Sequence, residues 1–168
     1  GVPLPEPVIR GGGHERGMRS GTLATHQIVG MGEAYALAVK EFKRDTSRLQ
    51  AMRDKLAAAL LALPGTKVNG SMSARLPNNL NVTFSGVNGE TFLLALRGLA
   101  VSTGSACTSA SLNPSYVLKA LGLSDSDAHS SIRISFGRFT TDEEIEAASK
   151  IFTEVYAEQK RLGSGWSA

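Results

Sequence analysis

The hydrophobic residues of this chain change their spacing at Pro64-Gly65, where a long helical pattern ends and a mixed pattern of strands and helices begins. Before that point, apolar residues recur every three or four positions, which is the period of an amphipathic helix. These residues are Ile28, Met31, Tyr35, Ala38, Phe42, Leu49, Met52, Leu56, Leu60 and Leu63. The spacing predicts one long helix or two abutting helices over 25–63, ended by the Pro-Gly pair. The polar segment 43–48 is expected to be a bend or an exposed crossing.

After Pro64 the apolar residues alternate with polar ones, which is the period of half-buried strands. The alternating residues are Leu80, Val82 and Phe84, and then Ile132, Ile134 and Phe136. The sequence between them predicts a short helix over 90–97 and a strand over 99–102. A further helix is expected to be capped by Asn113, to have Pro114 as its first residue and to run to Gly122.

Thr140 and Glu143 predict the start of the last helix, because their spacing fits a capping box. An apolar stripe follows it at Ile145, Ala148, Ile151, Val155 and Leu162. Together the elements predict an α+β fold in which a long helix leads into a domain with a small, mostly antiparallel sheet covered by helices.

Composition and charge narrow the class of protein. A chain of 168 residues with 42% hydrophobic and 20% charged residues suits one compact core. The net charge is +3, but the basic residues are scattered and no nucleic-acid-binding motif accompanies them, so we expect no direct binding to nucleic acid. No apolar run reaches the ~18 residues of a membrane span, and the first residues lack the regions of a signal peptide. We expect a soluble, cytoplasmic protein that contacts no membrane.

Cys107 is the only cysteine, and it lies in the segment TGSACTSASLNPSY, among small and polar residues. A single cysteine cannot form an internal disulfide, so its thiol is free. A structural cysteine would usually lie in an apolar element, whereas a reactive thiolate needs polar, partly exposed surroundings. The segment therefore favours a nucleophilic or redox role for Cys107, on a loop over 103–112 that we expect to be mobile. No histidine lies within twenty residues of it, so any activating base must come from elsewhere in the fold or from a ligand.

A second polar segment, GGGHERGMRSGT, ends at Thr22 directly before the long helix. Glycine-rich backbone, two arginines and a hydroxyl at a helix N-terminus suit a phosphate. The alternative is a polar turn with solvated arginines.

Arg133 is the notable residue of the third segment, SSIRISFGR. Strand alternation turns its side chain to the face opposite Ile132 and Ile134, either to solvent or into a cleft where it could bind a substrate carboxylate. No metal site is expected, because the three histidines are dispersed and only one cysteine is present.

These segments also carry a resemblance to a known family. HERGMRSGT, TGSACTSASLNPSYVL and AHSSIRISFGRFTTDEEI resemble, in this order, the C-terminal portion of pyridoxal-phosphate cysteine desulfurases of the NifS/IscS type, within the class-V aminotransferases. The resemblance implies the C-terminal part of the fold type I of pyridoxal-phosphate aminotransferases. It implies that 1–24 are the end of the cofactor-binding large domain, 25–63 a connecting helix and 64–168 the small C-terminal domain with the thiol loop.

The resemblance also implies a reaction and partners. Cysteine desulfurases convert L-cysteine to L-alanine and leave a persulfide on the loop cysteine, for iron–sulfur cluster assembly and tRNA thiolation. Cys107 matches that cysteine, Arg133 matches the arginine that binds the substrate carboxylate, and Thr22 matches a threonine that binds the cofactor phosphate of the neighbouring subunit. The implied partners are L-cysteine, iron–sulfur scaffold and sulfur-acceptor proteins, and a second subunit in a homodimer.

One feature of the family is not found. Its cofactor lysine follows a histidine, and no lysine of this sequence does. We therefore expect the chain to correspond to the C-terminal portion of such an enzyme and to be inactive without the lysine-bearing half. A cofactor-free sulfur carrier or interaction module that uses Cys107 is the alternative, and a plain binding domain with an incidental cysteine is a third hypothesis.

Overall fold

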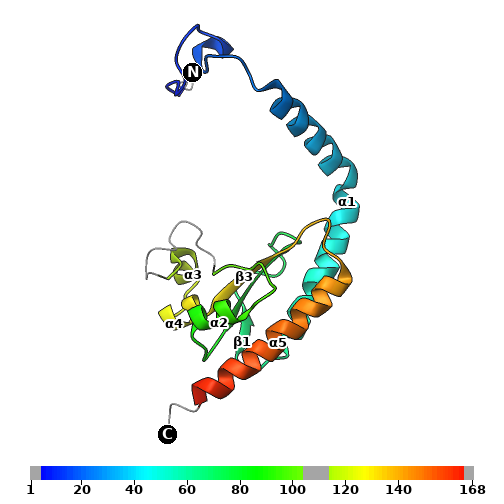
Figure 1. Ribbon diagram of the computed structural model, residues 1–168, viewed down its shortest axis with the longest axis vertical. Helices are drawn as coiled ribbons and strands as arrows, with labels where there is room; N and C mark the ends of the chain where they lie inside the picture. Colours follow the sequence, from blue (N-terminus) through cyan, green and yellow to red (C-terminus); the bar gives the residue numbers. More distant parts are fainter. Residues whose placement is uncertain (1–4, 104–113, 165–168) are drawn as a thin grey trace. The chain divides into compact units, whose positions relative to one another are not determined.

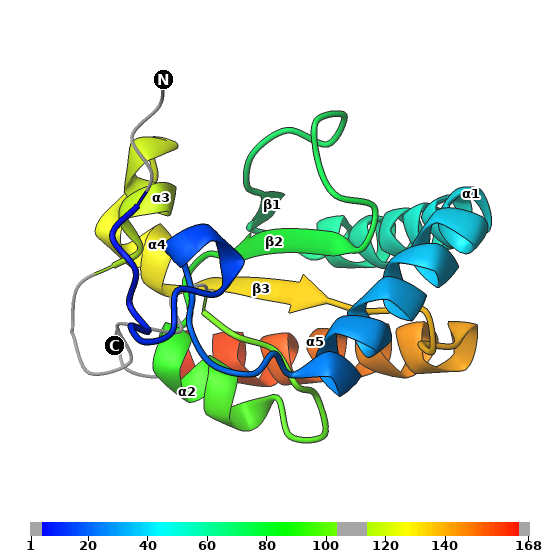
Figure 2. The same ribbon diagram turned by 90° about the horizontal axis from the view of Figure 1, so that it is seen from above.

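A computed structural model describes residues 5–103 and 114–164 of the chain, and Figures 1 and 2 show it from two sides. The described chain forms two compact units, Gly1–Phe42 and Lys43–Ala168, and each is considered on its own. The elements in order are η1 Glu15–Gly17, α1 Thr25–Leu61, β1 Thr66–Val68, β2 Asn79–Phe84, α2 Gly89–Ala95, α3 Tyr116–Ala120, α4 Asp125–His129, β3 Ser131–Ser135 and α5 Asp142–Ser164.

The helical period before Pro64 corresponds to one helix, α1, which is continuous through the polar segment 43–48. Lys43, Arg44 and Ser47 are exposed, as an exposed crossing predicts, whereas two other polar residues of the segment bind the turn that precedes α5. Arg48 donates to the carbonyl oxygens of Arg138 and Thr140, at 2.6 Å and 2.7 Å. Asp45 accepts from the Arg138 guanidinium. These residues therefore join the helix to the rest of Lys43–Ala168.

The sheet has three antiparallel strands in the order β1-β2-β3. Its core face is covered by the second half of α1, by α2 and by α5, as Figure 2 shows. Phe84 lies at the centre of this core, and its ring stacks on Phe152 with the centroids 5.5 Å apart. The opposite face is polar near α4, where Thr83 and Ser131 are fully buried. The predicted α+β class and antiparallel sheet are thus confirmed.

The segment 99–102 is not the expected strand. It makes only one isolated bridge, between Ser102 and Arg133. Gly98 has a φ of +86°, which begins a turn. Leu99 and Val101 then pack against the core without a ladder of backbone hydrogen bonds. The apolar residues of this segment thus serve packing and not a strand.

Two helix caps lie elsewhere than expected. The helix α3 has Ser115 as its N-cap and begins at Tyr116, after Pro114, while Asn113 lies outside the described residues. The capping box of α5 is formed one position later than Thr140, by Thr141 and Glu144. The Thr141 N–H donates to Glu144 Oε2 at 2.9 Å, and the Glu144 N–H to Thr141 Oγ1 at 3.2 Å.

The later box forms because the hydroxyl of Thr140 is already used. Its Oγ1 accepts from the Gly137 N–H at 3.2 Å, and its own N–H donates to the Gly137 carbonyl at 3.1 Å. Thr140 thus closes the turn that precedes α5, which leaves Thr141 to cap the helix. Both threonines have a glutamate three positions later, so the spacing could not distinguish them.

Candidate functional site

The three predicted site residues lie in different parts of the chain. Thr22 is exposed in the unit Gly1–Phe42, and Arg133 is exposed in the unit Lys43–Ala168. Cys107 lies within 104–113, outside the described residues. The expectation of a mobile loop therefore stays a prediction, and the candidate site is described around Thr22 and Arg133 separately.

The glycine-rich segment before α1 is held by its own backbone. Ser20 is buried, its N–H donates to the Ile9 carbonyl at 3.0 Å, and its Oγ accepts from the Gly13 N–H at 3.3 Å. A Cβ at Gly11 would lie 3.2 Å from the Ser20 Cβ. The close approach of these two parts of the segment therefore favours glycine at position 11. The segment is therefore an ordered turn in front of the helix.

The ordered turn leaves the Thr22 side chain accessible. Arg19 donates from Nη1 to the carbonyl oxygens of Gly21 and Thr22, at 2.8 Å and 3.1 Å. Within residues 5–103 and 114–164, the Thr22 hydroxyl has no hydrogen-bond partner. An accessible hydroxyl beside a basic, glycine-rich turn fits one corner of a phosphate site. These residues fit the phosphate of pyridoxal phosphate.

Arg133 is placed by the alternation of β3. Ile132 and Ile134 enter the core, and Arg133 extends from the opposite face, as the sequence predicted. Its backbone pairs with Ser102 on one side, with an N–H···O distance of 2.6 Å from Arg133 and 3.2 Å from Ser102. Asn81 of β2 lies directly opposite it on the other side. The backbone of Arg133 is thus hydrogen-bonded on the Ser102 side and lies beside β2 on the other.

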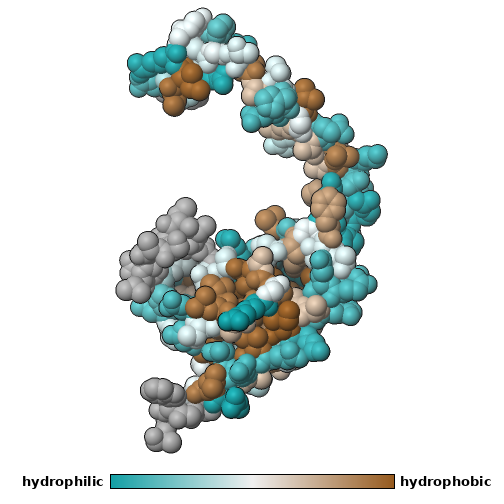
Figure 3. Space-filling view, in the orientation of Figure 1, coloured by the Kyte–Doolittle hydropathy of each residue, from teal (hydrophilic) through white to brown (hydrophobic). Residues whose placement is uncertain are grey.

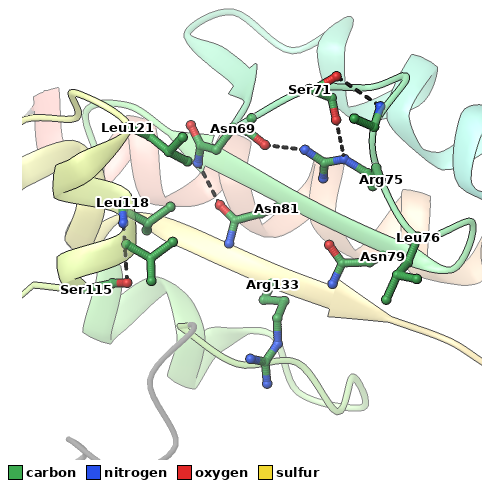
Figure 4. Close-up of a pocket in the computed structure, with 13 residues that line it drawn as sticks. Asn69, Ser71, Arg75, Leu76, Asn79, Asn81, Ser115, Leu118, Leu121 and Arg133 are labelled. Carbon is green, nitrogen blue, oxygen red and sulfur yellow. Dashed lines mark hydrogen bonds between the residues drawn. The ribbon is translucent and has the colours of Figure 1, made fainter.

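A cavity of about 500 Å³ lies over this face of the sheet. It is bounded by β2, β3, the loop 69–76 and α3, and its lining mixes three asparagines and two arginines with leucines. Figure 4 shows Arg133 extending from β3 on the side away from Asn69 and Arg75. This mixture suits a small polar ligand that carries a negative charge.

The two arginines of the cavity differ in what they bind. Arg75 donates from Nε to the Ser71 carbonyl at 2.9 Å and from Nη2 to the Asn69 carbonyl, so it closes the loop 69–76. Burial, and to a smaller extent the charge of Arg53, lower the pKa of Arg75. In the part of the chain that the structure describes, no acceptor binds the guanidinium of Arg133. Arg133 is therefore the arginine that is available to a ligand.

A second hollow of about 360 Å³ lies between α5 and the segment 98–101. Its lining is largely apolar and includes Leu99, Val101, Phe136 and Ile151. Figure 3 shows hydrophobic side chains gathered over the middle of the visible face of Lys43–Ala168. Because it has no cationic side chain among its lining residues, this hollow does not suit a carboxylate.

The described residues lack two further features. No group of three or more histidine, cysteine or acidic side chains among them could hold a metal ion. None of the helices in the described ranges combines the length and apolar character needed to cross a membrane.

Comparison with known proteins connects this geometry to a family. The family model described as "Aminotransferase class-V" matches residues 11–148. The chain belongs to the class-V aminotransferase family. The match includes both Thr22 and Arg133.

Curated relatives within the family are similar over nearly the whole chain. The chain is 56% identical over 161 residues to a protein of Pseudomonas aeruginosa (strain LESB58) named cysteine desulfurase IscS. It is 55% identical to proteins of the same name from Stutzerimonas stutzeri and Pasteurella multocida. Each match covers 96% of this chain and 40% of the relative, so the chain spans about 40% of the length of these relatives.

Solved structures confirm the fold. A structure titled "NIFS-LIKE PROTEIN" matches 94% of this chain and 40% of its own, with a TM-score of 0.80 and 34% identity. A NifS-like protein from Rickettsia africae matches 90% of this chain and 40% of its own, with a TM-score of 0.78 and 31% identity. The resemblance to the NifS/IscS type is thereby confirmed, whereas the roles of Cys107, Arg133 and Thr22 stay predictions.

Sequence reasoning missed the polar residues that neighbour Arg133 on the sheet. Asn81 lies opposite Arg133 and accepts from Asn69, and neither asparagine was singled out. The alternation of Leu80, Val82 and Phe84 already places Asn81 on the face opposite the core. Only the register between β2 and β3 shows that it meets Arg133.

Proposed function

We propose that this chain supplies the C-terminal part of a cysteine desulfurase that depends on pyridoxal phosphate. The observation that carries the proposal is its 56% identity, over 96% of its length, to a protein named cysteine desulfurase. The Arg133 guanidinium supports it, because it lines a cavity, has no acceptor among the described residues, and a substrate amino acid brings a carboxylate to be bound. Cysteine as the substrate follows from the same relatives.

In this proposal each residue has a separate role. Arg133 binds the substrate carboxylate through its planar fork of N–H donors and orients the amino acid. Thr22 binds the cofactor phosphate with its accessible hydroxyl. Pyridoxal phosphate, when bound, supplies the electron sink that makes cleavage of the C–S bond feasible.

Cys107 acts after the substrate is in place. Its thiolate attacks the substrate sulfur, a new S–S bond forms, and the C–S bond breaks with its electron pair going to the substrate carbon. That carbon takes up a proton, so the products are alanine and a persulfide on Cys107. The persulfide then serves iron–sulfur scaffold and other sulfur-acceptor proteins, including those of tRNA thiolation, in the cytoplasm.

The same proposal assigns the parts of the chain. Residues 1–24 belong to the cofactor-binding domain, 25–63 connect, and 64–168 form the small domain. The first half of α1 exposes large hydrophobic side chains, and those exposed by more than half include Met31, Tyr35, Val39 and Phe42. Such exposure is typical of a surface that packs on further polypeptide. A surface of this kind is consistent with a homodimer of complete subunits.

The test is a chimera that joins the N-terminal part of the P. aeruginosa relative to this chain in place of its matching region. We expect the chimera to release alanine from L-cysteine and to form a persulfide on Cys107, measured by amino-acid analysis and by mass spectrometry. A chimera that folds and binds pyridoxal phosphate but releases no alanine would refute the proposal. Persulfide transfer to the 168-residue chain from a donor enzyme, without alanine release by the chimera, would instead support the sulfur-carrier alternative.

A further inference from the structure

The sheet carries a straight row of polar side chains on its cavity face. Asn69 follows β1 and donates its backbone N–H to the Asn81 carbonyl at 2.9 Å. Asn81 is the register partner of Arg133, and Arg133 is bridged to Ser102. Residues directly opposite one another in antiparallel strands share a face. A row of four neighbouring residues therefore crosses the sheet at the position of Arg133. In order, they are Asn69, Asn81, Arg133 and Ser102.

Within this row, Asn81 and Arg133 form the closer kind of pair. The Phe84 N–H donates to the Ser130 carbonyl. Because paired residues of antiparallel strands alternate between bonded and non-bonded, the even-numbered residues of β2 are hydrogen-bonded to their partners in β3 and the odd-numbered ones are not. Asn81 and Arg133 then form a pair without mutual backbone bonds, in which the Cα atoms are about 4.5 Å apart and side chains lie closest. Both side chains line the cavity.

The orientation of the Asn81 amide follows from a chain of hydrogen bonds that begins at a backbone carbonyl. The Asp127 carbonyl can only accept, so Ser131 Oγ donates to it, at 2.6 Å. Ser131 Oγ therefore accepts from Asn69 Nδ2, at 3.1 Å. The same Nδ2 donates to Asn81 Oδ1 at 2.7 Å. The Asn81 oxygen is thus committed to the buried network.

The Asn81 nitrogen is left as a donor. Within the described ranges, Asn81 Nδ2 has no acceptor. Figure 4 shows this nitrogen on the side of Asn81 that faces away from Asn69 and toward Arg133. The network behind it is rigid, because Asn69, Thr83 and Ser131 are buried and Thr83 donates to Asn69 Oδ1 at 3.0 Å. The row therefore carries N–H donors on two residues that line the cavity and are paired across the strands, one set charged and one neutral.

We propose that Asn81 is a second substrate-binding residue, whose side-chain N–H group donates to the same substrate carboxylate that Arg133 binds. The inference rests on the proposed function, since it takes the ligand of Arg133 to be a carboxylate. Asn69 acts through Asn81 as a positioning residue, because it fixes the amide with its nitrogen toward the cavity. A site made only of donors selects a carboxylate over an amide, whose own NH₂ group would face them.

The test uses the 168-residue chain and L-alanine, the amino acid that the proposed reaction releases. Side-chain NMR signals of Arg133 Nε–H and Asn81 NH₂ are followed during titration with L-alanine and, in parallel, with alaninamide. We expect both signals to shift and saturate with L-alanine and to stay in place with alaninamide. If the Asn81 signal does not move with L-alanine, the inference is wrong.

Asn81→Asp is the decisive variant. Its carboxylate still accepts from Asn69 Nδ2, so the network and the fold are kept, but it replaces the cavity donor with a negative charge. We expect the affinity for L-alanine to fall by roughly tenfold or more, because a charge-assisted bond is lost and a like charge is added. Ser135→Ala is the matched control, on the same face of β3 and one pair along, and should leave the affinity unchanged.

Arg133→Ala separates failure of this inference from failure of the proposed function. If Arg133→Ala weakens binding and Asn81→Asp does not, the role of Asn81 is refuted and that of Arg133 stands. If neither variant weakens binding, the carboxylate role of Arg133 is refuted as well. Thermal unfolding of each variant, with an Asn69 NH₂ signal in Asn81→Asp that stays as slow to exchange with solvent as in the wild type, shows that the fold and the network are intact.

Discussion

The carboxylate of Asp45 lies 2.8 Å from Nη2 of Arg138, which binds α1 to the turn before α5 across 93 positions of sequence. The hydrogen bond from Arg138 is the largest of the causes that lower the pKa of Asp45, and partial burial opposes it. The lowered pKa makes this contact sensitive to acid.

Asp45→Asn should lower the midpoint of thermal unfolding at neutral pH. A carboxyl with a lowered folded-state pKa stabilises the fold above its unfolded pKa of about 3.9, and this stabilisation is lost as the pH falls through the folded-state value. The difference between wild type and variant should therefore shrink below about pH 4. Circular dichroism melts from pH 7 to pH 2.5 measure it.

Glu33→Gln is the control, since this carboxylate is exposed on the same helix. Its side chain makes no ion pair within the described residues, so the midpoint should change little at any pH. A difference for Asp45→Asn that stayed constant down to pH 2.5 would show that the Arg138 contact is not the cause.

Gly89→Ala should destabilise the protein strongly. A Cβ at Gly89 would lie 1.9 Å from the carbonyl oxygen of His129, which is backbone and cannot rotate away. Forcing a methyl group into such a contact costs about 1–3 kcal/mol or more. Denaturant unfolding measures the loss.

Gly137→Ala is the matched substitution. No atom lies within 4 Å of its Cβ position and its φ is not positive, so the change in unfolding free energy should stay within about 0.5 kcal/mol. Equal effects of the two substitutions would mean that α2 does not approach His129 as described.

Much of the fold could be predicted from the sequence, because the apolar residues that recur at helical or strand spacing are the residues that pack in the core. The stripe before Pro64 and the two alternating segments each supply residues of one core, such as Leu56, Val82 and Ile132. Where two neighbouring residues could both cap a helix, the local sequence does not show which one does. Thr140 and Thr141 both fit a capping box, and the competing bond to Gly137 decides between them.

The candidate site was less accessible to sequence reasoning. The exposure of Arg133 follows from alternation alone, but its opposition to Asn81 depends on the strand register. Register is set by contacts between segments far apart in the chain. The short strand β1 and the helix α4 were also missed, since each is too short to show a period.

In the chimera, Cys107→Ser should abolish persulfide formation while cofactor and substrate binding are kept. The thiol acts only after cysteine is bound, so binding does not need it. Absorbance of the bound cofactor and equilibrium binding of L-alanine measure the retained functions, and mass spectrometry measures the lost one. Full sulfur transfer by the serine variant would show that another group accepts the sulfur.

Thr22→Val should weaken cofactor binding in the chimera and leave the affinity for L-alanine at saturating cofactor nearly unchanged. Valine keeps the shape of threonine and removes the hydroxyl, whose bond to a charged phosphate is worth ~1.5–3 kcal/mol, or roughly ten- to a hundredfold in affinity. Equilibrium dialysis of pyridoxal phosphate measures the change. Unaltered cofactor affinity would remove Thr22 from the phosphate site.

The alternation of β3 couples the aim of Arg133 to the integrity of the core. Ile132 and Ile134 are buried on one face, and Arg133 leaves from the other. Sliding β3 by a single residue against β2 would bring the guanidinium among Phe84 and Phe152 and expose both isoleucines, which costs far more than the chain's margin of stability. Misaligned molecules would therefore unfold instead of persisting as folded proteins with a misdirected arginine. At this strand, the packing that stabilises the fold therefore also ensures that every folded molecule has its arginine on the cavity face.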